Sequence, residues 1–370
     1  ISQLSKKGHA GISLFANHRN RQLYDHNGDG FSELSSLSNK SLGAKIFYLP
    51  KANHKLEFSF NLLREQRYGG EMGVQRTELA QQAEERVHRV GLYSLEYQVA
   101  LNDQTNWVAY LGGQQTIREH YTGILPDDSL ELANHLESPP FGNSKNYSLQ
   151  AGTQLNYRPQ KVFNSRNRFS FGLEYLMDDV LDQIPAYDFL VDQRSQNTGL
   201  FLQSDWNLRP RWNLLTGLRI DHHNFIDQLL VSPRLSMLFK ANKRWQIRGG
   251  YSSGFRAPQA FDTDLHIAFA GGGVSRISLA DDLKHERSHS TNLSINYDAA
   301  CERMIYGFTV EAFYTSLQRV FILESLGEDA FGERFEKRNG KEALVSGLTL
   351  EGRINLNQEL QIESGITLQN

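Results

Sequence analysis

Apolar and polar residues alternate along most of this 370-residue chain. In residues 147–157, Tyr147, Leu149 and Leu155 share one set of alternate positions, and Ser148 belongs to the other. Successive side chains of a strand point to opposite faces, so this period of two predicts strands with one apolar and one polar face. The pattern recurs about fifteen times, and many segments reach ~10 residues, about twice the mean strand of globular proteins. The predicted strands are 8–16, 41–49, 54–66, 87–100, 106–119, 144–157, 168–177, 194–206, 211–223, 231–240, 244–253, 288–298, 303–323, 341–355 and 359–369.

The connections between these strands are alternately short and long, with few exceptions. This order places the long connections at one end of the strands and the short ones at the other, as in outer-membrane barrels. A large soluble all-β protein, the alternative, has no physical reason for such asymmetry. We therefore predict an all-β fold: an antiparallel transmembrane β-barrel with short periplasmic turns and long extracellular loops. The long connections are 17–40, 67–86, 120–143, 178–193, 254–287 and 324–340, and we expect Gln75–Val87 to be loop, with a helix as the alternative.

Composition excludes several other classes of protein. Mean hydropathy is negative, and no run of about eighteen apolar residues occurs, which argues against membrane-spanning helices. A net charge of -3 argues against a nucleic-acid partner. The single cysteine, Cys301, excludes an internal disulfide framework and a multi-cysteine metal site. The sequence motifs of common hydrolases and nucleotide-binding enzymes are missing, so we do not expect an enzyme.

The two ends of the sequence predict that it is part of a longer protein. The chain starts at Ile1 with no methionine or leader, and it stops within the alternating segment 359–369. We expect residues 1–370 to be one barrel domain, as a fragment.

Two neighbouring segments are distinctive: Val231–Ser236 reads VSPRLS, and Gly250–Gln259 reads GYSSGFRAPQ. Together they resemble the barrel of TonB-dependent outer-membrane receptors. Phe201–Trp206, Phe261–His266 and Asn61–Gly70 are similar to other parts of the same barrels. The resemblance extends over nearly the whole chain.

The resemblance implies a plugged barrel of about 22 strands in the outer membrane of a Gram-negative bacterium. Such a receptor takes up a ferric siderophore, haem or vitamin B12 with energy delivered by its partner TonB. Its partners would be TonB, a small molecule or metal chelate, and outer-membrane lipid. Relative to that pattern we find no plug and no last strands, so about 15 strands would not close the barrel alone. A passive porin or an adhesin without TonB coupling is the alternative function.

One predicted outer loop contains the start of a calcium-binding pattern. Oxygen-bearing residues alternate before Gly30, as in the first half of a calcium loop, but position twelve is Ser36 rather than glutamate. An ordinary Asn/Asp/Gly turn is the alternative. No cofactor is expected to be required, and a structural Ca²⁺ ion would order the loop. The candidate ligands are Asp25, Asn27, Asp29, Phe31 and Glu33.

Candidate substrate contacts come from the predicted outer loops. We expect Arg256 to face the lumen and to pair with a charge at the root of loop 254–287. The acidic and histidine residues of that loop match no tight metal motif, so a solvated polar loop is the alternative to a zinc or iron site. The candidate substrate-binding residues are Arg256, Asp262, Asp264, His266, Tyr121 and Tyr187.

Overall fold

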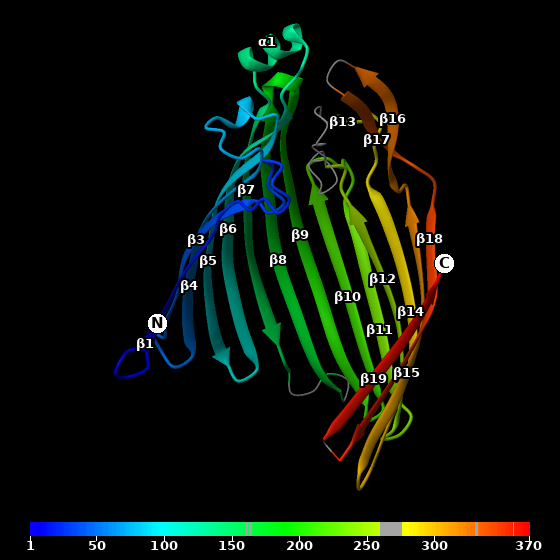
Figure 1. Cartoon of the computed structure of the whole chain (residues 1–370). Coiled ribbons are helices and arrows are strands. Elements are labelled where there is room, and N and C mark those ends of the chain that lie inside the picture. The colour runs from blue at the N-terminus through cyan, green and yellow to red at the C-terminus, as the bar shows by residue number, and fades with distance from the viewer. Residues whose placement is uncertain (160–161, 163–164, 260–275, 330–331, 358) are drawn as a thin grey trace.

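The computed structural model describes residues 1–159, 162, 165–259, 276–329, 332–357 and 359–370. Their main feature is one sheet of 16 antiparallel strands that follow one another in chain order. Figure 1 shows this sheet curved into an open trough, with β1 and β19 as its two edges. The described residues therefore form an all-β fold, in which the open sheet is part of a barrel. Its strands are β1 (Ser2–Leu4), β2 (Ala10–Arg21), β3 (Ser36–Tyr48), β4 (His54–Gly70), β5 (Gln82–Asn102), β6 (Thr105–Ile124), β7 (Phe141–Tyr157), β8 (Arg166–Ile184), β9 (Phe189–Arg209), β10 (Trp212–His223), β11 (Leu230–Lys240), β12 (Trp245–Arg256), β14 (Glu286–Cys301), β15 (Met304–Gln318), β18 (Ala343–Leu356) and β19 (Leu360–Gln369).

All fifteen predicted strands coincide with strands of this sheet, and the three-residue β1 is the additional one. A second sheet of three strands lies at the loop end, where β13 (Arg276–Leu279) pairs in parallel with β17 (Gly332–Asn339). Its third strand, β16 (Phe321–Asp329), begins inside the segment predicted as the end of one long strand, 303–323. Arg319, at a φ of 57°, separates β15 from β16.

The outward faces of the strands are apolar and exposed, and the described residues form no large central apolar core. On β4, for example, Leu56, Phe58 and Leu62 are 36, 38 and 41% exposed. Buried apolar residues form three small clusters, centred on Phe189, Tyr121 and Leu230. An apolar exterior and a polar interior are the arrangement of a transmembrane barrel. Among the described helices, none combines the length and apolarity needed to cross a membrane.

Several long loops of the prediction are shorter in the structure, because strand pairing continues past the apolar segments. The connection predicted at 178–193 is a tight turn, with pairing up to Ile184↔Phe189 and the 3₁₀ turn η2 (Pro185–Tyr187) between. Asp188 ends that turn in the left-handed region, at a φ of 47°. The connection predicted at 67–86 narrows to residues 71–81, with the 3₁₀ turn η1 (Thr77–Leu79). The segment Gln75–Val87 is thus loop, one 3₁₀ turn and the start of β5, and the helix alternative is wrong.

One short helix lies in the loop between β6 and β7. Helix α1 (Ser129–Glu137) begins after Asp128, whose carboxylate accepts hydrogen bonds from the backbone N–H groups of Leu130 and Glu131. Its first turn carries Glu131 and its last turn His135, which complements the helix dipole. Figure 1 shows α1 at the loop end, far from the short turns.

Candidate functional site: the outer vestibule

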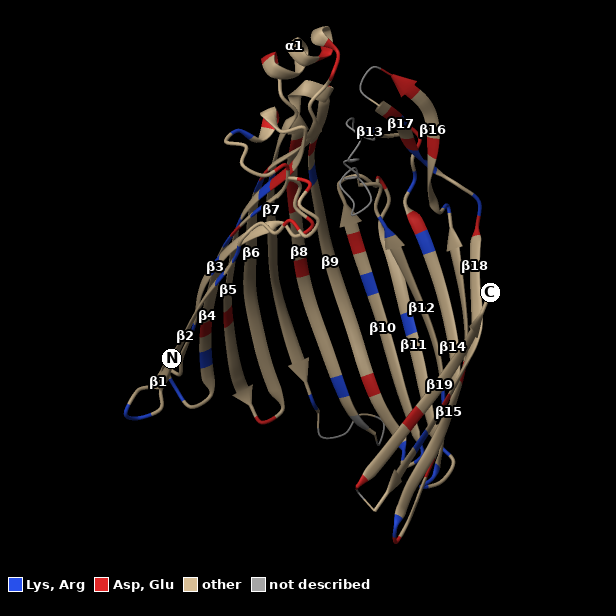
Figure 2. Cartoon of the chain, in the orientation of Figure 1, with Lys and Arg blue, Asp and Glu red and all other residues tan. Residues whose placement is uncertain are grey.

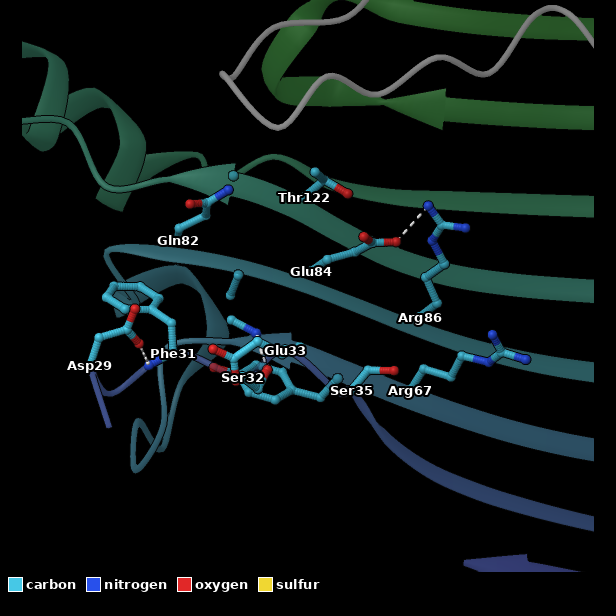
Figure 3. A pocket seen from close by; sticks show the side chains of 15 residues that line it. Asp29, Phe31, Ser32, Glu33, Ser35, Arg67, Gln82, Glu84, Arg86 and Thr122 are labelled. Carbon is cyan, nitrogen blue, oxygen red and sulfur yellow. Dashed lines mark hydrogen bonds and ion pairs between the residues drawn. The ribbon is translucent and has the colours of Figure 1, made fainter. Parts of the chain in front are cut away.

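A cavity of about 730 Å³ lies where β4, β5 and β6 reach the loop end of the sheet. Its strand wall includes Arg67, Gly70, Glu84, Arg86 and Thr122, and its other wall is the loop between β2 and β3. Figure 3 shows the loop residues on one side of the cavity and the strand residues on the other. The cavity is wide enough to hold a small molecule. We call it the outer vestibule.

Backbone hydrogen bonds fix the loop that forms this wall to the end of β4. The amide of Ser32 donates to the carbonyl of Gly70 at 3.0 Å, and the amide of Gly70 donates to Ser32 Oγ at 2.9 Å. The amide of Met72 donates to the carbonyl of Gly30 at 2.8 Å. Gly70 is required here: its φ is +128°, and an added Cβ would lie 2.2 Å from the carbonyl oxygen of Gln82.

Two arginines face the vestibule from neighbouring strands. Arg67 and Arg86 are directly opposite each other in the β4–β5 register, on the polar face of the sheet. Arg67 Nε lies 2.7 Å from Glu65, and Arg86 Nη2 lies 2.5 Å from Glu84. The arginine side chains are 54 and 48% exposed. Their carboxylate partners orient the guanidinium groups while leaving N–H donors available to an anionic ligand.

A polar network continues down the lumen-facing side of the sheet. Arg219 of β10 contacts Glu174 of β8 at 3.0 Å and Asp221 at 2.9 Å. Glu174 also accepts hydrogen bonds from Gln150 of β7 and Tyr110 of β6. These contacts join four strands through side chains that a lipid-facing surface would not tolerate. Figure 2 shows charged residues interrupting otherwise uncharged strands, with both signs gathered toward the loop end of β3–β8. The polar side of the sheet is therefore the lumen.

The loop predicted to bind calcium brings its three carboxylates together. One oxygen each from Asp25, Asp29 and Glu33 lies within 4.8 Å of the others, a spacing that allows a shared cation. Asn27 is part of the same turn, because its Oδ1 accepts from the amide of Asp29 at 3.0 Å. The amide of Phe31 donates to Asp29 Oδ1 at 2.8 Å, and the predicted role of its carbonyl as a calcium ligand stays a prediction.

Backbone donors already stabilise the acidic side chains of this loop. The amides of Gly30 and Gly28 donate to the Asp25 carboxylate at 2.9 and 2.6 Å, which lowers the pKa of that carboxyl below its usual range. The amide of His26 donates to Glu33 at 2.6 Å. These bonds belong equally to an ordinary Asx turn, so calcium binding stays a prediction. Asp29 and Glu33 also line the vestibule.

Tyr121 lies on the outward side of β6, close to its outer end, where the loop over residues 71–81 covers it. It is 0% exposed and packs against Ala80 and Ala83. Burial raises the pKa of its phenol to about 12. The side chain is therefore covered in this conformation, because its ring fills the space beneath the loop, and its predicted ligand contact stays a prediction. Tyr187, in η2, packs beside Phe189 and keeps partial exposure, so its predicted ligand contact is untested.

Arg256 ends β12 at the root of the long loop, facing the lumen side. Its guanidinium lies 3.7 Å from Glu286 and 5.5 Å from the ring centre of Phe321. This is the charge pairing that the sequence predicts, whereas contact with a substrate is untested. Asp262, Asp264 and His266 lie outside the described residues.

The sequence prediction missed Arg86 as a site residue. It lies in a segment predicted as loop, where Glu84, Glu85 and Arg86 are three consecutive charged residues. No local pattern marked it, because only the pairing of β5 with β4 brings Arg86 opposite Arg67.

The architecture is shared with a known family of proteins. Residues 15–369 match the family described as TonB dependent receptor-like, beta-barrel. The iron-regulated outer membrane virulence protein of Vibrio cholerae serotype O1 (strain ATCC 39315 / El Tor Inaba N16961) is 33% identical over 97 residues, which are 26% of this chain and 15% of that protein.

Solved receptors share the fold at low identity. The siderophore receptor PirA from Pseudomonas aeruginosa superposes with a TM-score of 0.73 at 15% identity, covering 100% of this chain and 61% of that one. A variant of the ferric enterobactin receptor PfeA from the same species, solved with enterobactin, gives 0.71 at 16% identity, covering 100% and 59%. This chain thus spans about six tenths of the length of these solved receptors.

The family is one of receptors rather than enzymes, and its barrels lie in the outer membrane of Gram-negative bacteria. The alternating strands, the polar lumen and the match over nearly the whole length agree with one another. This chain belongs to the TonB-dependent receptor family and forms part of an outer-membrane β-barrel.

Proposed function

We propose that the receptor containing this barrel binds a ferric siderophore in the outer vestibule and imports it with energy from TonB. The observation that carries the proposal is the pair of half-exposed arginines, Arg67 and Arg86, opposite each other in a cavity of about 730 Å³. Guanidinium groups form strong, directional hydrogen bonds with anionic oxygens. Many ferric chelates present such oxygens.

Three similar proteins support iron as the cargo. The Vibrio protein is named as iron-regulated, and the solved PirA and PfeA proteins are named as siderophore and ferric enterobactin receptors. Vitamin B12 and haem, the other cargoes of the family, have no comparable support among these relatives. Family membership supports energy coupling through TonB, which separates this proposal from a passive porin.

The test is binding and uptake by the receptor expressed in outer membranes of a siderophore-deficient host. We expect growth on one or more purified ferric siderophores under iron limitation, and loss of that growth when TonB is deleted. Growth on the same chelates without TonB would instead show a passive pore. Growth only on corrinoid or haem would overturn the siderophore assignment.

The vestibule itself is tested by truncating its arginines. Arg67→Ala and Arg86→Ala should each weaken binding of the transported chelate about 10-fold or more, since charged hydrogen bonds contribute roughly 1.5–3 kcal/mol. Arg353→Ala is the matched control, because Arg353 also pairs with a carboxylate, Asp298, and is 40% exposed, but near the short-turn end of β18. Equal effects of all three substitutions would contradict a vestibule site.

A further inference from the structure

Three basic residues form a row on the outward face of β3, β4 and β5. Lys40 is directly opposite Arg64 in the β3–β4 register, and Arg64 is directly opposite Arg89 in the β4–β5 register. Side chains at such opposed positions on one face lie about 4.5–5.5 Å apart at Cβ, and like charges there repel one another. The row therefore concentrates positive charge in one place.

Among the described residues, little neutralises this row. Arg89 pairs with Glu119 of β6 at 2.8 Å, with both side chains 46% exposed. Throughout the ranges that the structure describes, we find no ion pair or side-chain hydrogen bond of Lys40 or Arg64. An external anion would relieve the repulsion.

The row lies at the outer edge of the apolar band. Going up from the short turns, the outward positions of β3 are Leu42, Ala44, Ile46 and Tyr48, and Lys40 is the first charge. On β4 the outward residues at positions 56, 58, 60 and 62 are all Leu or Phe, and Arg64 follows them. On β5 the outward residues at odd positions 91–101 are uncharged before Arg89. All three residues thus lie at the level where hydrocarbon gives way to the headgroups of the outer leaflet.

A groove continues from the row into the apolar band. It has a volume of about 440 Å³, and Lys40, Arg64 and Arg89 share its lining with Leu42, Leu62 and Tyr93. These last three side chains are 50, 41 and 45% exposed. Gly91 leaves space for the ring of Tyr93, because a Cβ added at Gly91 would lie only 2.9 Å from the Tyr93 hydroxyl oxygen. A charged rim above an apolar groove has the polarity of a lipid.

Two other outward cations near the loop end have partners within the protein. Arg194 of β9 forms an ion pair with Asp179 of β8. Arg287 of β14 donates to the backbone carbonyl of Val231. Lys145 of β7 is opposite Ile117, which is opposite Arg89, so it continues the same row, and among the described residues it too has no ion pair. The uncompensated charge is thus confined to β3–β7 and is not a uniform belt.

We propose that this groove binds a phosphorylated lipid of the outer leaflet. Its phosphate would lie between Lys40, Arg64 and Arg89, and one acyl chain would extend along Leu42, Leu62 and Tyr93. The phosphate supplies the negative charge that Glu119 supplies only in part. The acyl chain covers apolar surface that the protein leaves exposed. The site faces the membrane, on the opposite side of the sheet from the vestibule.

The test uses the receptor purified from outer membranes in detergent, delipidated and titrated with lipid A. The variant Lys40→Gln/Arg64→Gln/Arg89→Gln should bind lipid A at least ten-fold more weakly than the wild type. The matched control, Lys51→Gln/Arg211→Gln/Lys243→Gln, removes the same charge from exposed residues of the short turns and should bind like the wild type. Dephosphorylated lipid A should bind the wild type at least ten-fold more weakly.

A second variant guards against misfolding as an explanation. Glu119→Gln removes the competing carboxylate and should strengthen lipid A binding about threefold, which a damaged protein would not do. Ferric siderophore binding should be unchanged in every variant, so failure here and failure of the vestibule proposal are distinguishable. Equal lipid A affinity in the triple variant and its control would overturn the proposal. So would full competition by inorganic phosphate alone, which would indicate a site for free anions.

Discussion

The two faces of β3–β5 present cations at the loop end in different ways. On the lumen face, Arg67 and Arg86 each have a carboxylate partner on the same strand. On the outward face, Lys40 and Arg64 have no such partner among the described residues, and only Arg89 has one, Glu119. On the lumen face, the carboxylates therefore orient the guanidinium groups and nearly balance their charge. This arrangement suits selective binding of a water-borne ligand. The outward face keeps net positive charge above an apolar groove, which suits an anionic lipid.

The largest expected effect comes from placing a charge in the middle of the outward face. Phe58→Arg would put a guanidinium in hydrocarbon and should destabilise the receptor by ~2–4 kcal/mol. Urea unfolding in phospholipid vesicles measures this. Ser59→Arg, one residue along β4 on the lumen face, is the control and should cost less than about 1 kcal/mol. Similar costs for the two variants would contradict the assignment of the faces.

Gly70→Ala tests the lumen side of the comparison. The residue's φ of +128° and the 2.2 Å approach of Gln82 O to an added Cβ require the end of β4 to shift. We expect a loss of about 1–3 kcal/mol in stability together with ferric siderophore binding weakened at least ten-fold. Gly352→Ala, with nothing within 4 Å of its added Cβ, should leave both nearly unchanged. Unchanged chelate affinity in Gly70→Ala would show that the vestibule is not the site.

Calcium titration tests whether the vestibule loop is a cation site. If it binds Ca²⁺, calorimetry of the receptor should give a Kd of about 10⁻⁴–10⁻³ M, as in extracellular calcium modules. Asp29→Ala should remove that heat, while Asp103→Ala, in the short turn between β5 and β6, should not. An absence of heat in the wild type would leave the loop as an ordinary Asx turn.

The smallest effect concerns Tyr121, which is outward-facing but covered by a loop rather than by lipid. Burial favours its neutral phenol and raises the pKa to about 12. The unfolded side chain ionises near pH 10, so the stability of the covering loop should be intact below about pH 10 and fall as the pH rises toward 12. Difference absorbance at 295 nm between wild type and Tyr121→Phe should show a titration near 12. A midpoint near 10 would mean that the loop does not cover the ring.

Most of the barrel could be predicted from the sequence because the membrane imposes alternation where strands cross it. In β5, the predicted segment 87–100 begins at residue 87, near the level where lipid contact stops. The strand itself begins five residues earlier, at Gln82. Above the membrane both faces are wet, so Glu84, Glu85 and Arg86 follow no apolar period and only pairing with neighbouring strands reveals the strand. The parallel pairing of β13 with β17 joins residues more than 50 positions apart, which no local pattern encodes.

The candidate sites also differ in whether a local pattern or strand pairing forms them. The local pattern around Asp25, Asn27 and Asp29 predicted a turn that brings carboxylates together, because turn chemistry is local. The vestibule and the outward basic row depend on register between strands. Arg67 meets Arg86, and Lys40 meets Arg64, only once the sheet is paired. The face of β6 that Tyr121 occupies also follows from this pairing, because Tyr121 is opposite Glu85.

The central claim is that adjacent residues of one strand face lipid and lumen, and fluorescence quenching by brominated lipid tests it most directly. Ser94 and Leu95 of β5 are both exposed in the structure, so only their faces distinguish them. With the exposed Cys301 first replaced by serine, Ser94→Cys and Leu95→Cys are each labelled with bimane and reconstituted. We expect strong quenching at position 95 and little at position 94. Equal quenching at the two positions, or the reverse order, would contradict it.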